Sequence, residues 1–140
     1  MFLLALLLAT ADARAEAILA NRQIVGCFAR VLADGSGPRP ESAAFVVLRG
    51  GVNFDCVPWP RTNDRHSAHF NGRVPAGTVA IVHSHPASQP EPSPHDLHEA
   101  QRLGISIFVV TPDAVTMAPA GGPAATITRD RDWWRGSPGF

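Results

Sequence analysis

The feature that most constrains this chain is the stretch from Val79 to Asp96, VAIVHSHPASQPEPSPHD. It begins within a β-rich apolar run over residues 78–82, which predicts a strand. Side chains two residues apart along a strand point to the same face, so His83 and His85 share one face. Pro86 cannot donate to a sheet ladder, and we therefore expect the strand to end just past His85. Two imidazoles at an open strand end predict a metal site.

A third candidate ligand lies at a helix start later in the same stretch. Ser93 suits the N-cap position, Pro94 suits the first helical position, and Asp96 falls in the first turn, where a carboxylate meets free N–H groups. If this turn packs against the strand end, His83, His85 and Asp96 converge as two nitrogens and one oxygen. A zinc ion held in this way keeps a fourth position open for water, which becomes nucleophilic near neutral pH. We expect one Zn²⁺ per chain.

The spacing of these residues is His83-x-His85, seven residues, Ser93, two residues and Asp96. It resembles the signature of the JAMM metallopeptidases of the JAB/MPN-domain family, and the proline after the second histidine also looks like this family. The resemblance extends from about residue 17 to residue 128. It implies an α/β fold, a single JAB/MPN-like domain with a mixed, curved β-sheet flanked by helices. It also implies a hydrolase that cleaves a peptide or isopeptide amide bond, often on ubiquitin-like modifiers, through a metal-activated water.

Upstream of this motif, Glu41 stands just before the apolar run AAFVVL, which predicts a buried strand. The family carries a glutamate in a corresponding place, so the resemblance nominates Glu41 as the general base and Ser93 as a donor to the developing oxyanion. The Gly-containing sequence that usually follows that glutamate is replaced by residues 42–44, SAA, and a solvated carboxylate at the strand end stays an alternative. Ser93 cannot easily cap its helix and serve an oxyanion at once, so we expect one of these roles to be partial.

Other sites that begin with a His-x-His strand fit less well. Metallo-β-lactamase-like hydrolases need an Asp and a His where this chain has Ala87 and Ser88. Amidohydrolases need a barrel of about 250 residues, which a chain of 140 residues cannot supply. Three alternatives stay open: a non-catalytic MPN-like zinc-binding or scaffold module, a processing peptidase for one fused or toxin-associated partner, and a histidine pair beside an ordinary capped helix.

Length and composition favour one compact domain. Of 140 residues, 45% are hydrophobic and 17% are charged, as expected for a chain that buries a core. Twelve Lys and Arg balance twelve Asp and Glu, so the chain lacks the charge that nucleic acid or an anionic membrane attracts. We expect a peptide or protein substrate and no nucleic-acid partner. The sequence does not indicate an oligomeric state.

The N-terminal sequence MFLLALLLATADARA resembles a secretory signal with a cleavage site after Ala15. Its apolar run over residues 2–9 is shorter than the about twenty residues that span a bilayer, so no integral membrane segment is expected after its removal. We therefore expect a periplasmic or secreted protein, and export would favour a peptide or cell-wall-type amide as substrate. Basic residues do not precede the apolar run, which leaves open a cytoplasmic protein whose first helix begins here.

The remaining sequence predicts helices and strands around the motif. Apolar residues recur at helical steps from about residue 17 to residue 33, and the motif's own helix should run over residues 94–103. Further strands are expected over residues 43–48, 52–57, 105–110, 114–118 and 124–128. The metallopeptidase domain would thus cover residues 16–129.

A polar, turn-rich segment over residues 58–77 is expected to overhang the site as a substrate loop. It contains His66 and His69, while His95 and His98 lie on the motif's helix. We expect these histidines to lie in solvent or near the ligands rather than to bind the metal themselves.

The cysteines and the C-terminal tail complete the sequence. Cys27 and Cys56 could form a disulfide only if the first helix packs on the second strand, so a disulfide and two buried thiols both stay open. The tail over residues 130–140 is polar apart from Trp133 and Trp134, which we expect to pack back onto the domain.

Overall fold

A computed structural model of the chain describes residues 11–35, 41–60 and 73–137. Two helices come first, and a third helix separates two groups of three strands, in the order α2 (Ala11–Ala20), α3 (Arg22–Asp34), β1 (Ala43–Arg49), β2 (Asn53–Pro58), β3 (Thr78–Ser84), α4 (Pro94–Leu103), β4 (Ser106–Thr111), β5 (Ala114–Ala118) and β6 (Ala125–Thr128). The strands form one sheet in the order β2-β1-β3-β4-β5-β6. Strands β3 and β4 are parallel, whereas the other neighbouring pairs are antiparallel. The expected α/β fold with a mixed sheet is confirmed.

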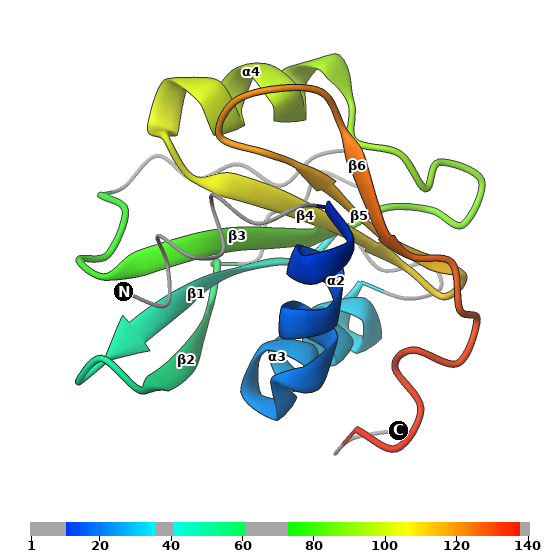
Figure 1. The fold of residues 1–140 in the computed structure, drawn as a ribbon, viewed down its shortest axis with the longest axis horizontal. Coiled ribbons are helices and arrows are strands. Elements are labelled where there is room, and N and C mark those ends of the chain that lie inside the picture. The colour runs from blue at the N-terminus through cyan, green and yellow to red at the C-terminus, as the bar shows by residue number, and fades with distance from the viewer. Residues whose placement is uncertain (1–10, 36–40, 61–72, 138–140) are drawn as a thin grey trace.

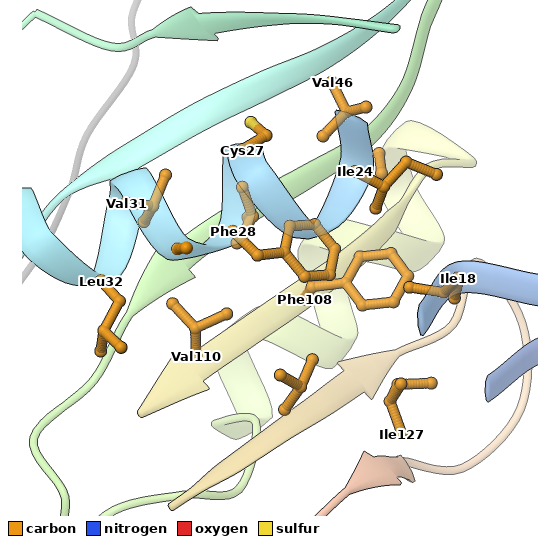
Figure 2. Close-up of a cluster of buried hydrophobic side chains, with 14 of the residues drawn as sticks. Ile18, Ile24, Cys27, Phe28, Val31, Leu32, Val46, Phe108, Val110 and Ile127 are labelled. Atoms are coloured by element: carbon orange, nitrogen blue, oxygen red, sulfur yellow. The ribbon is translucent and has the colours of Figure 1, made fainter. Parts of the chain in front are cut away.

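Helices cover both faces of the sheet (Figure 1), with α4 on one face and α2 and α3 on the other. Both faces of β1, β4 and β5 are therefore buried. This explains why the sequences of these strands are almost continuously apolar instead of alternating between apolar and polar residues. Figure 2 shows the larger core, beneath α3, where the rings of Phe28 and Phe108 lie 4.9 Å apart. The smaller core lies beneath α4 and includes Phe45, Ile81 and Ala100.

The single helix predicted over residues 17–33 is wrong, because the chain forms two helices that meet at Asn21. The side chain of Asn21 accepts hydrogen bonds from the backbone N–H groups of Gln23 and Ile24, at 3.0 and 3.1 Å, and so caps α3. An asparagine that bonds nearby backbone groups competes with a continuous helix. Ile18 of α2 still packs in the larger core with Ile24, which is why the apolar period continues across the break.

Cys27 and Cys56 form a disulfide that joins α3 to β2, with their Cα atoms 5.3 Å apart. This pairing resolves the alternative that the sequence left open. It depends on the packing of α3 against β2, which local sequence signals do not report.

Trp133 and Trp134 of the C-terminal tail pack against the turn between β4 and β5, as predicted. Trp133 is buried, and its indole N–H donates to the Thr111 carbonyl at 2.8 Å. Trp134 is half-buried and donates in the same way to the Pro112 carbonyl at 3.0 Å. Within the described ranges, no helix is long and apolar enough to cross a membrane.

Candidate metal centre

Strand β3 delivers both histidines to the side of the sheet that α4 covers. Ile81 packs in the core beneath α4, and alternation along the strand puts His83 on that same face. The strand ends at Ser84, one residue before His85, whose backbone N–H still donates to the Val110 carbonyl at 3.1 Å. The predicted strand end is therefore confirmed to within one residue.

The first turn of α4 delivers the carboxylate. Ser93 is the N-cap, and its hydroxyl oxygen accepts from the Asp96 N–H at 3.1 Å. In return, the Asp96 Oδ2 atom accepts from the Ser93 N–H at 2.8 Å, which completes a capping box. The predicted cap is confirmed. This box fixes the orientation of a side chain that is only 8% exposed.

Three of the predicted site residues converge at the end of β3. The Nε2 atom of His83 lies 3.0 Å from Asp96 Oδ1, and the Nε2 atom of His85 lies 3.7 Å from Asp96 Oδ2. The two imidazole rings stand edge to face with their centroids 4.6 Å apart. Asp96 thus faces the same type of nitrogen on both histidines.

Glu41 reaches this cluster from the start of β1. Ala43 pairs with His83 in the antiparallel β1–β3 ladder, so Glu41, two residues earlier, lies on the same face of the sheet. Its side chain is only 13% exposed, unlike a solvated strand-end carboxylate, and its Oε2 atom is 4.0 Å from His83 Nδ1. One ligand atom from each of Glu41, His83 and His85 falls within 4.8 Å of the others, so these residues could hold a metal ion.

The two carboxylates approach His83 through different ring nitrogens, Glu41 near Nδ1 and Asp96 near Nε2. An imidazole offers one nitrogen to a given ion, and the other nitrogen then faces a partner that orients the ring. Glu41 and Asp96 are therefore two alternative candidates for a third ligand beside the histidine pair.

The bonding of the imidazoles fits a cation site. His83 Nε2 is buried and has no hydrogen-bond partner within the described part of the chain, although Asp96 Oδ1 is close. His85 Nδ1 lies 3.0 Å from the Gln89 carbonyl oxygen, which can only accept, so Nδ1 carries the proton and Nε2 keeps its lone pair. Two imidazole nitrogens and a carboxylate oxygen are ligands that zinc takes in proteins.

Electrostatics favour the protonation states that metal ligands need. Burial raises the pKa of Asp96, but the neighbouring imidazole of His83 and the Ser93 N–H outweigh burial and lower this pKa to about 2. Burial and the proximity of His83 lower the pKa of the His85 imidazole below its usual value. Near neutral pH, Asp96 is therefore ionised and His85 is neutral.

Sequence reasoning missed Ser84, which lies on the opposite face of β3 from the candidate ligand His83. Its hydroxyl oxygen accepts from the Ser42 N–H at 3.0 Å, and its own N–H donates to the Ser42 carbonyl at 2.9 Å. A Cβ atom at Gly35 would overlap the Ser84 hydroxyl, so the C-cap of α3 approaches closely because it has no side chain. Alternation along the strand could have revealed Ser84 as a buried hydroxyl in need of a partner.

The other histidines lie away from the ligand cluster or outside the described residues. His95 and His98 are exposed on α4, as expected for surface residues. His66 and His69, with most of the expected substrate loop, fall in residues 61–72, outside the described ranges.

Comparisons with known proteins bear on the same part of the chain. A family model described as prokaryotic homologs of the JAB domain matches residues 37–135, which include Glu41, both histidines, Ser93 and Asp96. Searches of curated proteins and of solved structures found no significant match.

Proposed function

Since the chain belongs to the family of prokaryotic homologs of the JAB domain, we propose that it is a zinc-dependent hydrolase of the JAMM type that cleaves a peptide or isopeptide amide bond. One observation carries this proposal, the convergence of His83, His85, Asp96 and Glu41 at one end of the sheet. Scaffold members of the wider family typically lose ligands, whereas this chain keeps the complete set.

In this proposal, His83, His85 and Asp96 hold the zinc ion. When bound, zinc supplies Lewis-acid polarisation of the substrate carbonyl and makes water a stronger acid. The Gln89 carbonyl keeps the proton of His85 on Nδ1, and the capping box keeps Asp96 turned towards the histidines. These contacts support the assignment because they pre-orient ligands before any metal binds.

Glu41 serves as the general base. It takes a proton from the attacking water at its carboxylate and delivers that proton to the departing amine. Its shielding from solvent supports this role, since a base surrounded by water gains little from its position. Ser93 donates its hydroxyl proton to the developing oxyanion. Capping uses a lone pair of that hydroxyl oxygen and the oxyanion contact would use its O–H, so the proposal assigns both roles to Ser93.

The substrate class follows from the compartment. Removal of residues 1–15 and export would present the enzyme with peptides or cell-wall-type amides, and we propose such a substrate. A chain retained in the cytoplasm would instead meet protein modifiers with isopeptide bonds.

The roles of the two carboxylates can be separated by one experiment. Protein purified without chelator would be assayed for zinc by mass spectrometry and for cleavage of peptide and isopeptide libraries, with and without chelator. We expect about one zinc per chain, lost in His83→Ala. Glu41→Gln should keep zinc but slow hydrolysis at least about a hundredfold, because loss of a general base typically costs 10²- to 10⁴-fold.

Glu91→Gln is the matched control, because Glu91 is exposed and pairs with Arg129 at the surface. It should bind zinc and cleave like the wild type. Loss of zinc in Glu41→Gln would identify Glu41 as a ligand, and a wild-type rate would exclude it as the base. Full zinc occupancy without cleavage of any library would favour the MPN-like scaffold module.

A further inference from the structure

We propose that Thr116 on β5 is a positioning residue for the metal centre, acting through the backbone of residues 89–90 on the His85 imidazole. This inference rests on the proposed zinc site, but it concerns a residue outside the motif and outside contact with the ligands. It predicts that zinc affinity depends on a hydroxyl group two strands away from the histidines.

Thr116 is a polar residue in an otherwise apolar, fully buried strand. It pairs with Val109, which pairs with His83, so the three residues form one row across β3, β4 and β5. A buried hydroxyl is costly unless it is hydrogen-bonded. The Thr116 hydroxyl meets this need by donating to the Pro90 carbonyl at 2.6 Å. The bond ties β5 to the segment between His85 and Ser93.

Because of the proline ring, the hydrogen bond to the Pro90 carbonyl also restricts the preceding peptide group. The peptide unit between Gln89 and Pro90 is planar, and the proline ring locks φ near −65°. Only one soft dihedral, ψ of Pro90, therefore separates the Gln89 carbonyl from the Pro90 carbonyl. The Gln89 N–H is held as well, since it donates to the Pro86 carbonyl at 2.9 Å. Fixing the Pro90 oxygen thus fixes the direction of the Gln89 oxygen.

The Gln89 oxygen is the group that accepts the Nδ1 proton of His85. A partner of this kind selects the tautomer and the ring orientation of a metal-binding histidine. With the Thr116 hydroxyl absent, the Pro90 carbonyl loses its donor and the Gln89 carbonyl can rotate away. His85 would then populate the other tautomer, which has no lone pair on Nε2 for the ion.

The test uses Thr116→Val, which keeps the β-branched shape and removes the hydroxyl, and Thr116→Ser, which restores it. Zinc affinity would be measured by competition with a chromophoric chelator. Thr116→Val should bind zinc about tenfold more weakly, the lower end of the range for partners that orient ligands, and Thr116→Ser should recover the wild-type affinity. Thr111→Val is the matched control, because Thr111 is also fully buried but its hydroxyl interacts within the β4–β5 turn.

A second readout needs no metal. Nitrogen NMR of the metal-free protein, at a pH where His85 is neutral, should show the proton on Nδ1 in the wild type and a mixture of tautomers in Thr116→Val. Pro90→Ala, at a half-buried loop position, frees the locked φ, so zinc affinity and the tautomer should shift in the same direction as in Thr116→Val. If Thr116→Val does not fold, Pro90→Ala tests the proposal in its place.

The proposal is overturned if folded Thr116→Val, or Pro90→Ala in its place, matches the wild type in both zinc affinity and tautomer. Absence of zinc binding in the wild type would instead refute the proposed function. The tautomer measurement would still decide whether Thr116 positions His85.

Discussion

Asp96 combines two tasks in one side chain, and its two oxygens can be told apart. Oδ2 accepts the Ser93 N–H that caps α4, while Oδ1 lies closest to His83. An amide at this position keeps one acceptor oxygen but loses the negative charge. Helix capping and metal binding should therefore respond differently to Asp96→Asn.

We predict that Asp96→Asn folds, because the Asn amide oxygen can still accept the Ser93 N–H; the weaker hydrogen bond should cost about 1 kcal/mol or less, and the missing charge adds a further, pH-dependent loss. Its zinc affinity should fall by more than about a hundredfold, beyond the usual effect of altering a residue that merely orients a ligand. Thermal unfolding of the metal-free protein and chelator competition would measure the two effects. Wild-type zinc affinity in this variant would rule out Asp96 as a ligand and leave Glu41 as the carboxylate in contact with the ion.

In the metal-free protein, the effect of Asp96→Asn on stability should depend on pH. The folded-state pKa of Asp96 is lowered, so its ionisation adds stability above the unfolded pKa of about 4, and this contribution disappears as the pH falls through about 2. The stability difference between wild type and Asp96→Asn should therefore shrink across this window. An unchanged difference from pH 4 to pH 2 would contradict the assigned shift.

At the scale of elements, three separate pieces of chain meet at Ser84. Strand β3 carries the residue, the segment before β1 supplies Ser42, and Gly35 at the C-cap of α3 lies against its hydroxyl. Glu41 is the residue before Ser42, so the hydrogen bonds to Ser84 hold Glu41, the proposed general base, beside His83. The proposed ligand His83 points to the opposite face of β3 and takes no part in this link.

We predict that Ser84→Ala keeps zinc but slows hydrolysis, because the Ser42 N–H loses its acceptor and Glu41 gains freedom. Loss of one such bond should also cost about 1 kcal/mol of stability. Amide hydrogen exchange at Ser42 should become faster, which reports the broken link directly. Ser88→Ala, at an exposed loop position, is the control and should change none of these. Unaltered exchange at Ser42 would show that the hydroxyl does not hold this segment.

The sequence alone predicted those elements whose ends are marked by neighbouring residues. Ser93, Pro94 and Gly104 mark both ends of α4 through capping chemistry, and the structure confirms them. The break at Asn21 was missed because the apolar period runs through it. Thr116 was missed because its partner, the Pro90 carbonyl, is distant in sequence and only the β4–β5 ladder brings it close. The residues that converge at the site were predictable, whereas the contacts that orient them depend on tertiary packing.

At the scale of the whole molecule, cleavage of the N-terminal segment and formation of the disulfide both depend on the compartment in which the protein resides. Helix α2 spans the expected cleavage site after Ala15, yet Ile18, which packs in the larger core, lies beyond that site. A chain that begins at Glu16 would keep this contact and the Asn21 cap of α3. An oxidising compartment would also maintain the disulfide between Cys27 and Cys56. Removal of residues 1–15 would thus leave these two contacts in place.

We therefore predict that protein made in a secreting host starts at Glu16 and carries the oxidised cysteine pair. Intact-mass analysis after alkylation without reduction should show the shortened chain with no added alkyl groups, because neither sulfur is free. Reduction before alkylation should add two groups, which serves as the internal control. A full-length chain from Met1 that takes up alkylating reagent without reduction would contradict export, and it would move the proposed substrate towards isopeptide-linked modifiers inside the cell.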